Sequence, residues 1–286
     1  MSVTHEDTRS GSALLRNEAF PVVDRRFGEN SLRLLAPNTW VQTQRFLIRF
    51  ARDPMTFFLG LVLPIGFLAV VDIVLGKTIS SVTGHSALHG SVPMVTLNAA
   101  IAGALVGVVG ITAEQANGFL ARLWVVPVHR ASGLIARVGA EAVRVAVNSI
   151  FLLGVGLLLG LRFEHGFSAS LAWLCVPVLF GVAFSVLVLT IALYWPSTTL
   201  VDVMVVVNSL LLFFCTGFVP LDQYPKWIQP VVEHQPLSYA IETMRGLSQG
   251  GPVLGPMLGT LLWSGGTLIV CAVPMVVGYR RASMRG

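Results

Sequence analysis

The sequence predicts an all-α integral membrane protein with six transmembrane helices, from its composition, its apolar runs and its charge distribution. Of 286 residues, 54% are hydrophobic and only 12% are charged, and the mean hydropathy is +0.76. Soluble domains carry about 45–50% apolar and about 25% charged residues. Because half the usual charge cannot cover a soluble surface of this size, we exclude an ordinary cytosolic enzyme, a disordered chain and a secreted disulfide scaffold.

Six apolar stretches follow one another along the chain, each close to the ~20 residues that a membrane-spanning helix needs. The uncharged stretch 166–201 is too long for one span, and Trp195-Pro196-Ser197 divides it. The last uncharged stretch opens with loop-like residues that include Gly255-Pro256, so we expect its span to begin just after them. The predicted spans are at about residues 57–76, 92–112, 139–161, 171–194, 202–219 and 257–279.

The basic residues predict the orientation. Fifteen of the 19 Lys and Arg residues lie before span one, between spans two and three or at the start of span three, or after span six. By the positive-inside rule these segments are cytoplasmic, which predicts a multi-pass protein of the plasma membrane with both termini in the cytoplasm. Residues 1–37 and 281–286 are then polar cytoplasmic tails, and residues 55–280 form the transmembrane domain. This signal accounts for the net charge of +5, so we expect no nucleic-acid partner.

Residues 38–54 predict an amphipathic helix at the membrane surface, ahead of span one. Four polar side chains recur at helical spacing on one face: Gln42, Arg45, Arg49 and Arg52. Thr39 is expected to cap the start of this helix, and Pro54 to end it. A basic amphipathic helix lies in the interface with its Arg side chains toward anionic headgroups. It is either an elbow that leads into span one or an ordinary juxtamembrane anchor.

The cytoplasmic segment 114–130 mixes apolar and basic residues more densely than a connecting loop needs. Its apolar and basic side chains include Leu120, Arg122, Leu123, Trp124 and Arg130. A helix that docks in a groove of a partner protein uses apolar anchors of this kind. The alternative is that the Leu and Trp side chains dip into the membrane interface, and the residues alone leave both possibilities open.

The external loop 220–256 contains two short amphipathic stretches between Pro and Gly breaks. The first carries Trp227, and Pro236 opens the second. One helical face of the second stretch is apolar: Leu237, Ile241, Met244 and Leu247. Glu242 and Arg245 stand three residues apart, where they can pair. We expect re-entrant or interfacial helices that form a structured lid; a plain surface loop is the alternative.

Charged residues are few inside the spans, where each costs about 2.5–3.5 kcal/mol on insertion scales. Glu141 and Arg144, three residues apart near the start of span three, are expected to form a structural ion pair. No row of acidic residues follows one span, as it does in many proton-coupled carriers. This disfavours a secondary transporter and leaves it as the second hypothesis.

The sequence carries no motif for nucleotide hydrolysis, metal binding or covalent catalysis. Gly76-Lys77-Thr78 resembles the end of a phosphate-binding loop, but Val71 occupies the position of the required earlier glycine. His85 and His89 are expected to be solvated, and the three cysteines lack metal-ligand spacing. We therefore expect no catalytic residue, and no cofactor or metal bound by this chain.

The segment 114–130 resembles the coupling region of ABC-2 type exporter permeases, whose pattern runs E-x-x-x-G-x-L-x-x-L-x-x-x-P-x-x-R. The matching positions are Glu114, Gly118, Leu120, Leu123, Pro127 and Arg130. The usual second acid before the glycine is Ala116 here, and the usual Thr or Ser before the proline is Val126. These two departures affect the details of how the segment contacts its partner protein, and they leave the resemblance itself in place.

The external loop is similar to the re-entrant region of the same family, which ends in a P-x-x-Y-x-x-x-x-x-R-G pattern. The matching positions are Pro236, Tyr239, Arg245 and Gly246. The resemblance covers about residues 40–283. Within the family, the chain most resembles the daunorubicin/doxorubicin-resistance permeases of actinobacteria, and among these the C-type subunit of mycobacteria.

This resemblance implies a permease that exports cargo while hydrolysis belongs to a partner. Two copies of an A-type cytoplasmic ATPase subunit would hold ATP and Mg²⁺ and act through segment 114–130. A second six-span permease, a B-type homologue or a copy of this chain, would complete the transporter. The cargo would be a complex cell-envelope lipid such as a phthiocerol dimycocerosate, a hydrophobic drug, or both. The alternatives are an ATP-independent secondary carrier for drugs or lipids and a membrane enzyme that acts on lipid.

The resemblance and the residue patterns together give two sets of candidate functional residues. The candidates for ATPase coupling are Glu114, Gly118, Leu120, Arg122, Leu123, Trp124, Pro127 and Arg130. The candidates for an outer gate are Trp227, Glu233, Pro236, Tyr239, Glu242 and Arg245.

Overall fold

The computed structural model of the chain describes residues 32–54, 58–83, 86–117, 132–163 and 166–284. These ranges are helical and contain no strand, as the composition predicts. The helices in chain order are α2 (Leu32–Arg52), the π-helix η1 (Phe58–Val62), α4 (Leu63–Thr83), α5 (Leu88–Ala116), α7 (Ser132–Leu159), α8 (Gly166–Tyr194), α9 (Thr198–Phe213), the 3-10 helix η2 (Leu221–Gln223), α10 (Gln229–His234), α11 (Pro236–Gln249) and α12 (Leu254–Met284).

Within the described ranges, four helical stretches are long and apolar enough to cross a bilayer. They are Leu88–Ala116, Ser132–Leu159, Ser168–Tyr194 and Leu254–Ala282. Two further apolar helices, Gly60–Val74 and Thr199–Phe213, are shorter and fall where the sequence predicts spans one and five. A bilayer core needs about 20 apolar residues per helix, so this set of helices implies a multi-pass membrane protein.

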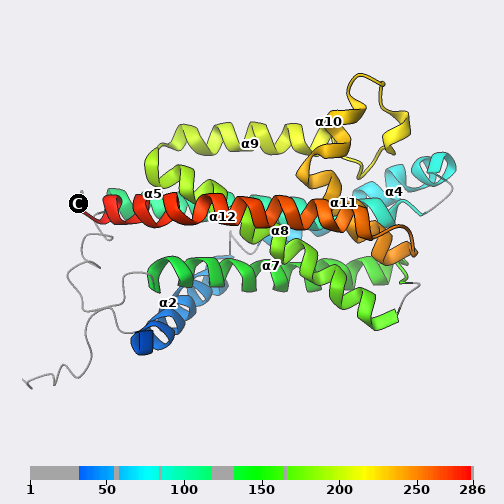
Figure 1. Cartoon of the computed structure of the whole chain (residues 1–286). Helices are drawn as coiled ribbons and strands as arrows, with labels where there is room; N and C mark the ends of the chain where they lie inside the picture. Colours follow the sequence, from blue (N-terminus) through cyan, green and yellow to red (C-terminus); the bar gives the residue numbers. More distant parts are fainter. Residues whose placement is uncertain (1–31, 55–57, 84–85, 118–131, 164–165, 285–286) are drawn as a thin grey trace, which may run out of the picture.

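Helix α5 forms the centre of the bundle. It contacts α4, α7, α8, α9 and α11, and its Met94, Leu97 and Ile101 side chains are fully buried. Helix α12 packs along α8 and α11 and leaves most of its surface exposed. Figure 1 shows α2 and the C-terminus at one end of the molecule and α10 and α11 at the other. We call these the α2 end and the α11 end.

The buried apolar side chains form two clusters, one toward each end. The cluster at the α11 end joins Trp173 of α8 and Leu152 of α7 to Ile241 of α11. The cluster at the α2 end joins Ile111 of α5 and Leu134 of α7 to residues of α8. Helices α5, α7 and α8 therefore pack side chain to side chain in both clusters, whereas α12 adds only partly buried side chains at the α2 end.

Two predicted helix starts were wrong. Helix α2 begins at Leu32, because the Leu, Arg and Ala residues before Thr39 favour a helix and Pro37 is accommodated inside it. Thr39 therefore caps nothing, and its hydroxyl has no hydrogen-bond partner in the described ranges. Helix α12 begins at Leu254 and includes Gly255-Pro256, which were expected to form a loop, since proline is tolerated in the first turn of a helix.

Candidate functional site

A charged cluster at the α2 end joins three helices around Glu114, the coupling candidate in the last turn of α5. Arg137 of α7 donates a hydrogen bond to the Glu114 carboxylate. Arg45 of α2 approaches the other carboxylate oxygen at 4.0 Å. The Arg137 guanidinium also lies over the Phe46 ring, 4.9 Å from its centroid. Because both partners of the Glu114–Arg137 pair are nearly buried, this contact fixes the end of α5 against α7 and α2.

The other coupling candidates follow Glu114 in the chain but lie outside the described residues. They are Gly118, Leu120, Arg122, Leu123, Trp124, Pro127 and Arg130. Their contribution to coupling stays a prediction. The helices on either side, α5 and α7, place both ends of this segment at the α2 end, next to the Glu114 cluster.

Arg144 of α7 forms an ion pair with Glu141 one turn earlier, where the sequence predicts a pair. The guanidinium reaches across to α5, where it donates a hydrogen bond to the Ala100 carbonyl at 3.5 Å. It occupies the space that a Cβ atom on Gly103 would take. The missing side chain of Gly103 therefore makes room for a buried cation.

A cavity of about 310 Å³ opens beside these two ion pairs, between α2, α5 and α7. One wall is apolar and includes Phe46 and Phe50 of α2. The other carries the Glu114–Arg137 and Glu141–Arg144 pairs. No sequence pattern indicates this cavity, because its lining comes from segments as far apart in the chain as Phe46 and Arg144.

The second polar cluster lies at the α11 end and is centred on Arg245. Arg245 donates to the Glu242 carboxylate at 2.8 Å, as its spacing predicts, and to the Thr216 carbonyl at 2.6 Å. Gly90, in the first turn of α5, faces both Arg245 and the Gly217 carbonyl so closely that a Cβ atom there would overlap them. Arg245 thus joins α11, the turn after α9 and the start of α5.

Two polar residues that the sequence reasoning missed hold the turn that follows α9. Gln235 donates hydrogen bonds to the Phe214 carbonyl at 2.6 Å and to the Ser238 hydroxyl at 2.9 Å. Tyr224 donates to the Cys215 carbonyl at 3.0 Å. Burial raises the pKa of the Tyr224 hydroxyl, with a smaller contribution from Cys215, so the hydroxyl keeps its proton. No periodic pattern marks either residue.

The structure does not bring all the gate candidates together. Trp227 is 78% exposed, and Glu233 on α10 is exposed as well. Pro236 opens α11. Tyr239 packs against Gly259 of α12 and meets the His234 ring edge-on. Only Glu242 and Arg245 are in direct polar contact.

Three asparagines inside the helical bundle make contacts between helices that the sequence reasoning also missed. Asn208 of α9 donates to the Asn98 side chain of α5 at 3.0 Å. Asn148 of α7 donates to the Gly60 carbonyl of η1 at 3.2 Å. A search for amide side chains within apolar runs would have found all three, since such groups need a partner in a membrane.

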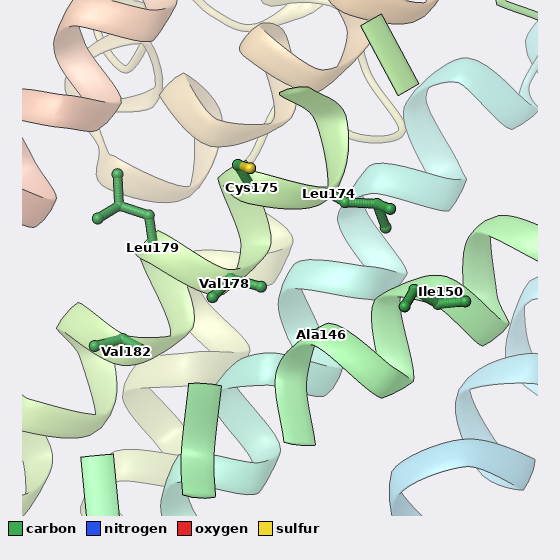
Figure 2. Close-up of a pocket in the computed structure, with 7 residues that line it drawn as sticks. All are labelled: Ala146, Ile150, Leu174, Cys175, Val178, Leu179 and Val182. Carbon is green, nitrogen blue, oxygen red and sulfur yellow. The ribbon is translucent and has the colours of Figure 1, made fainter. Parts of the chain in front are cut away.

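An open apolar groove of about 440 Å³ lies between α7 and α8. Figure 2 shows its lining, which comes from these two helices alone: Ala146, Ile150, Leu174, Cys175, Val178, Leu179 and Val182. The groove offers no charged or hydrogen-bonding side chain apart from the thiol, so it suits hydrocarbon and does not orient a polar ligand.

No group of three or more potential metal ligands occurs among the residues that the structure describes. His89, expected to be solvated, instead contacts the Ser248 hydroxyl at 3.2 Å because α11 packs onto the start of α5. Both polar clusters are therefore built from ion pairs and backbone hydrogen bonds, which position helices.

Comparison with known proteins identifies relatives over most of the chain. The family model for the ABC-2 type transporter matches residues 37–247. A probable doxorubicin resistance ABC transporter permease, DrrC of Mycobacterium tuberculosis, is 49% identical over 255 residues, which cover 89% of this chain and 92% of the relative. The daunorubicin resistance permease DrrB1 of Streptomyces coeruleorubidus is 24% identical, over 78% and 79% of the two chains. The putative transport permease ycf38 of Cyanophora paradoxa is 28% identical, over 73% of each.

Proposed function

The chain belongs to the ABC-2 type transporter family, with the doxorubicin-resistance permeases, and from this premise we propose that it is the membrane-spanning subunit of an ATP-driven exporter. The observation that carries the proposal is the 49% identity to such a permease over nearly the whole of both chains. Relatives of this kind are permease subunits, and hydrolysis is assigned to a separate protein.

The proposed topology has six spans. They are η1 with α4, then α5, α7, α8, α9 and α12, and α2 lies in the interface as an elbow. The charge distribution supports an orientation with both termini and the α2 end in the cytoplasm. Helices α10 and α11 then lie on the outer side, as re-entrant or interfacial helices.

The proposed coupling runs through the segment after Glu114. Two copies of a cytoplasmic ATPase, which binds ATP and Mg²⁺, would contact residues 118–130 through Leu120, Leu123 and Trp124. A second six-span permease, a B-type homologue or a copy of this chain, would complete the transporter. The Glu114–Arg137 pair and Arg45 support this proposal, because they connect the start of the segment to two further helices.

The proposed cargo is amphipathic: a complex cell-envelope lipid such as a phthiocerol dimycocerosate, a hydrophobic drug, or both. Two relatives are named for resistance to doxorubicin and daunorubicin, which supports a drug as cargo. The apolar groove between α7 and α8 suits a hydrocarbon part of either cargo. The outer gate is assigned to the α10–α11 region, with Trp227, Glu233 and Tyr239 on its surface or edge and the Arg245–Glu242 pair inside.

The experiment is copurification of the full-length chain with the ATPase subunit of the same transporter, followed by doxorubicin uptake into inverted membrane vesicles. Leu123→Asp should abolish copurification and ATP-dependent uptake, because a carboxylate cannot replace an apolar anchor in a protein groove. Leu123→Met is the matched control and should retain both. Normal assembly of Leu123→Asp contradicts the coupling proposal. Uptake that survives removal of the ATPase but stops without a proton gradient would instead identify a secondary carrier.

A further inference from the structure

A trough of empty space follows one face of α5 where this helix passes α2 and α7. Three glycines share that face, Gly103, Gly107 and Gly110; the space beside Gly107 and Gly110 is open, whereas the Arg144 guanidinium fills the space beside Gly103. A Cβ atom on Gly107 would meet no heavy atom within 4 Å, and one on Gly110 would meet only the Arg137 guanidinium, at 3.8 Å. Val106 and Val109, 45% and 51% exposed, complete the apolar lining. The trough is therefore open hydrocarbon-like space along a helix at the centre of the bundle.

The same cavity is charged at its mouth beside α2 and again at its inner end, where the Arg144 guanidinium lies against Gly103. The ionisable lining residues are Arg49, Arg137, Arg144, Asp53, Glu114 and Glu141. Four of them form the two ion pairs described above, and Arg45 adds a further cation beside Glu114. Arg49 makes no hydrogen bond or ion pair with the residues that the structure describes. The lining itself carries three cations and three anions, and Arg49 is the cation available to a ligand.

The position of this mouth matches the depth of a lipid headgroup. Helix α2 is amphipathic and carries its basic residues on one face, the pattern of a helix in the membrane interface. The trough runs from α2 along α5, which is long and apolar enough to span the bilayer. A charged mouth therefore lies at the interface, and an apolar trough leads from it along α5 as far as the Glu141–Arg144 pair.

We propose that this cavity binds one phospholipid from the leaflet on the α2 side, with its phosphate at Arg49 and one acyl chain along the glycine trough. A guanidinium binds phosphate oxygens through two parallel hydrogen bonds. The volume of about 310 Å³ lies within the range of ordinary ligand sites, about 300–1,000 Å³. A free phosphate ion would leave the trough empty. The site is separate from the proposed cargo path and does not depend on transport.

The decisive variant fills the trough without disturbing its surroundings. Gly107→Leu places an isobutyl group where a Cβ atom meets nothing within 4 Å. Gly154→Leu on α7 is the matched control, because Gly154 is also helical and its Cβ position is also open. Gly154 does not line the cavity. The measurement is native mass spectrometry of the full-length protein in detergent, titrated with phosphatidylglycerol.

We expect the wild type and Gly154→Leu to bind one phosphatidylglycerol with equal affinity, and Gly107→Leu to bind it at least about tenfold more weakly. Arg49→Gln should also weaken binding, by about threefold to tenfold. Arg52→Gln is its control, since Arg52 lies in the same turn of α2 but outside the lining. Inorganic phosphate at equal concentration should not displace the lipid.

Three results would overturn the proposal. They are an unchanged affinity in Gly107→Leu, an equal loss in both glycine variants, and full displacement by inorganic phosphate, which would indicate an ionic site only. Far-UV circular dichroism checks that each variant is folded. If Gly107→Leu does not fold, the test uses Gly107→Ala together with the comparison of Arg49→Gln and Arg52→Gln. These smaller changes leave the contacts between helices intact.

Discussion

Gly90 gives the sharpest test of how the α11 end is assembled. It lies in the first turn of α5, against the backbone of Gly217 and the guanidinium of Arg245. Replacing it with alanine adds one methyl group. A Cβ atom there would overlap the Gly217 carbonyl oxygen, and a backbone atom cannot rotate away. The substitution must therefore separate α5 from the turn that follows α9.

The magnitude follows from the contacts on that turn. Non-bonded heavy atoms pack at about 3.5–4.0 Å, so the two backbones must move apart by roughly 1 Å. The hydrogen bond from Arg245 to the Thr216 carbonyl, 2.6 Å long, ends on the same turn. Losing a hydrogen bond to a charged group costs about 1.5–3 kcal/mol, and overpacking adds about 1–3 kcal/mol. The higher helix propensity of alanine offsets about 0.5–1 kcal/mol of this loss, so we expect a net loss of about 1.5–5.5 kcal/mol.

The assay is equilibrium unfolding of the full-length protein in mixed micelles, with increasing sodium dodecyl sulfate and circular dichroism as the signal. Gly107→Ala is the control on the same helix, because its Cβ position is open, and it should match the wild type or exceed it by up to about 1 kcal/mol. In an Arg245→Met background, Gly90→Ala should cost less, since the hydrogen bond is already lost. Equal stability of Gly90→Ala and Gly107→Ala would refute this reasoning.

Two further predictions concern contacts inside the bundle. Arg144→Met should lower the free energy of unfolding by about 3–5 kcal/mol in the same assay, because it leaves the nearly buried Glu141 carboxylate without its partner. Adding Glu141→Gln to this variant should recover most of the lost stability. A double variant no more stable than Arg144→Met would contradict the ion-pair explanation. Asn208→Leu should lower the free energy of unfolding by about 0.6–1.7 kcal/mol, because the hydrogen bond to Asn98 is lost. In an Asn98→Leu background the same substitution should lower it by nearly nothing. An unchanged loss in that background would show that the amide pair is not responsible.

Local patterns predicted the elements well. The apolar face of the second external stretch is confirmed in α11, where Leu237, Ile241 and Met244 are fully buried. Its start is confirmed too, because Pro236 opens the helix; the helix ends at Gln249, and Gly250 follows it with a φ of 76°. Helical periodicity, proline and glycine all act within a few residues, so one segment of sequence contains the whole signal.

Contacts between distant segments were not predictable in the same way. Arg245 was matched with Glu242, three residues away, but its bond to the Thr216 carbonyl ends on a backbone atom that carries no sequence signal. Glu114 was a candidate because of the family pattern, whereas its partner Arg137 lies on the next described helix and was counted only as an orientation charge. Periodicity shows which face of a helix is buried, and it does not show which helix covers that face.

Helix α5 is the one element that takes part in both polar clusters, with Gly90 at its beginning and Glu114 near its end. These residues are separated by about 36 Å of continuous helix at 1.5 Å per residue. An α-helix is stiff along its axis. A displacement of about 1 Å at one end therefore moves the other end as well, without rearrangement of side chains in between. A small slide or tilt of this one helix would therefore move both polar clusters together, within the room that the helices packed around it leave.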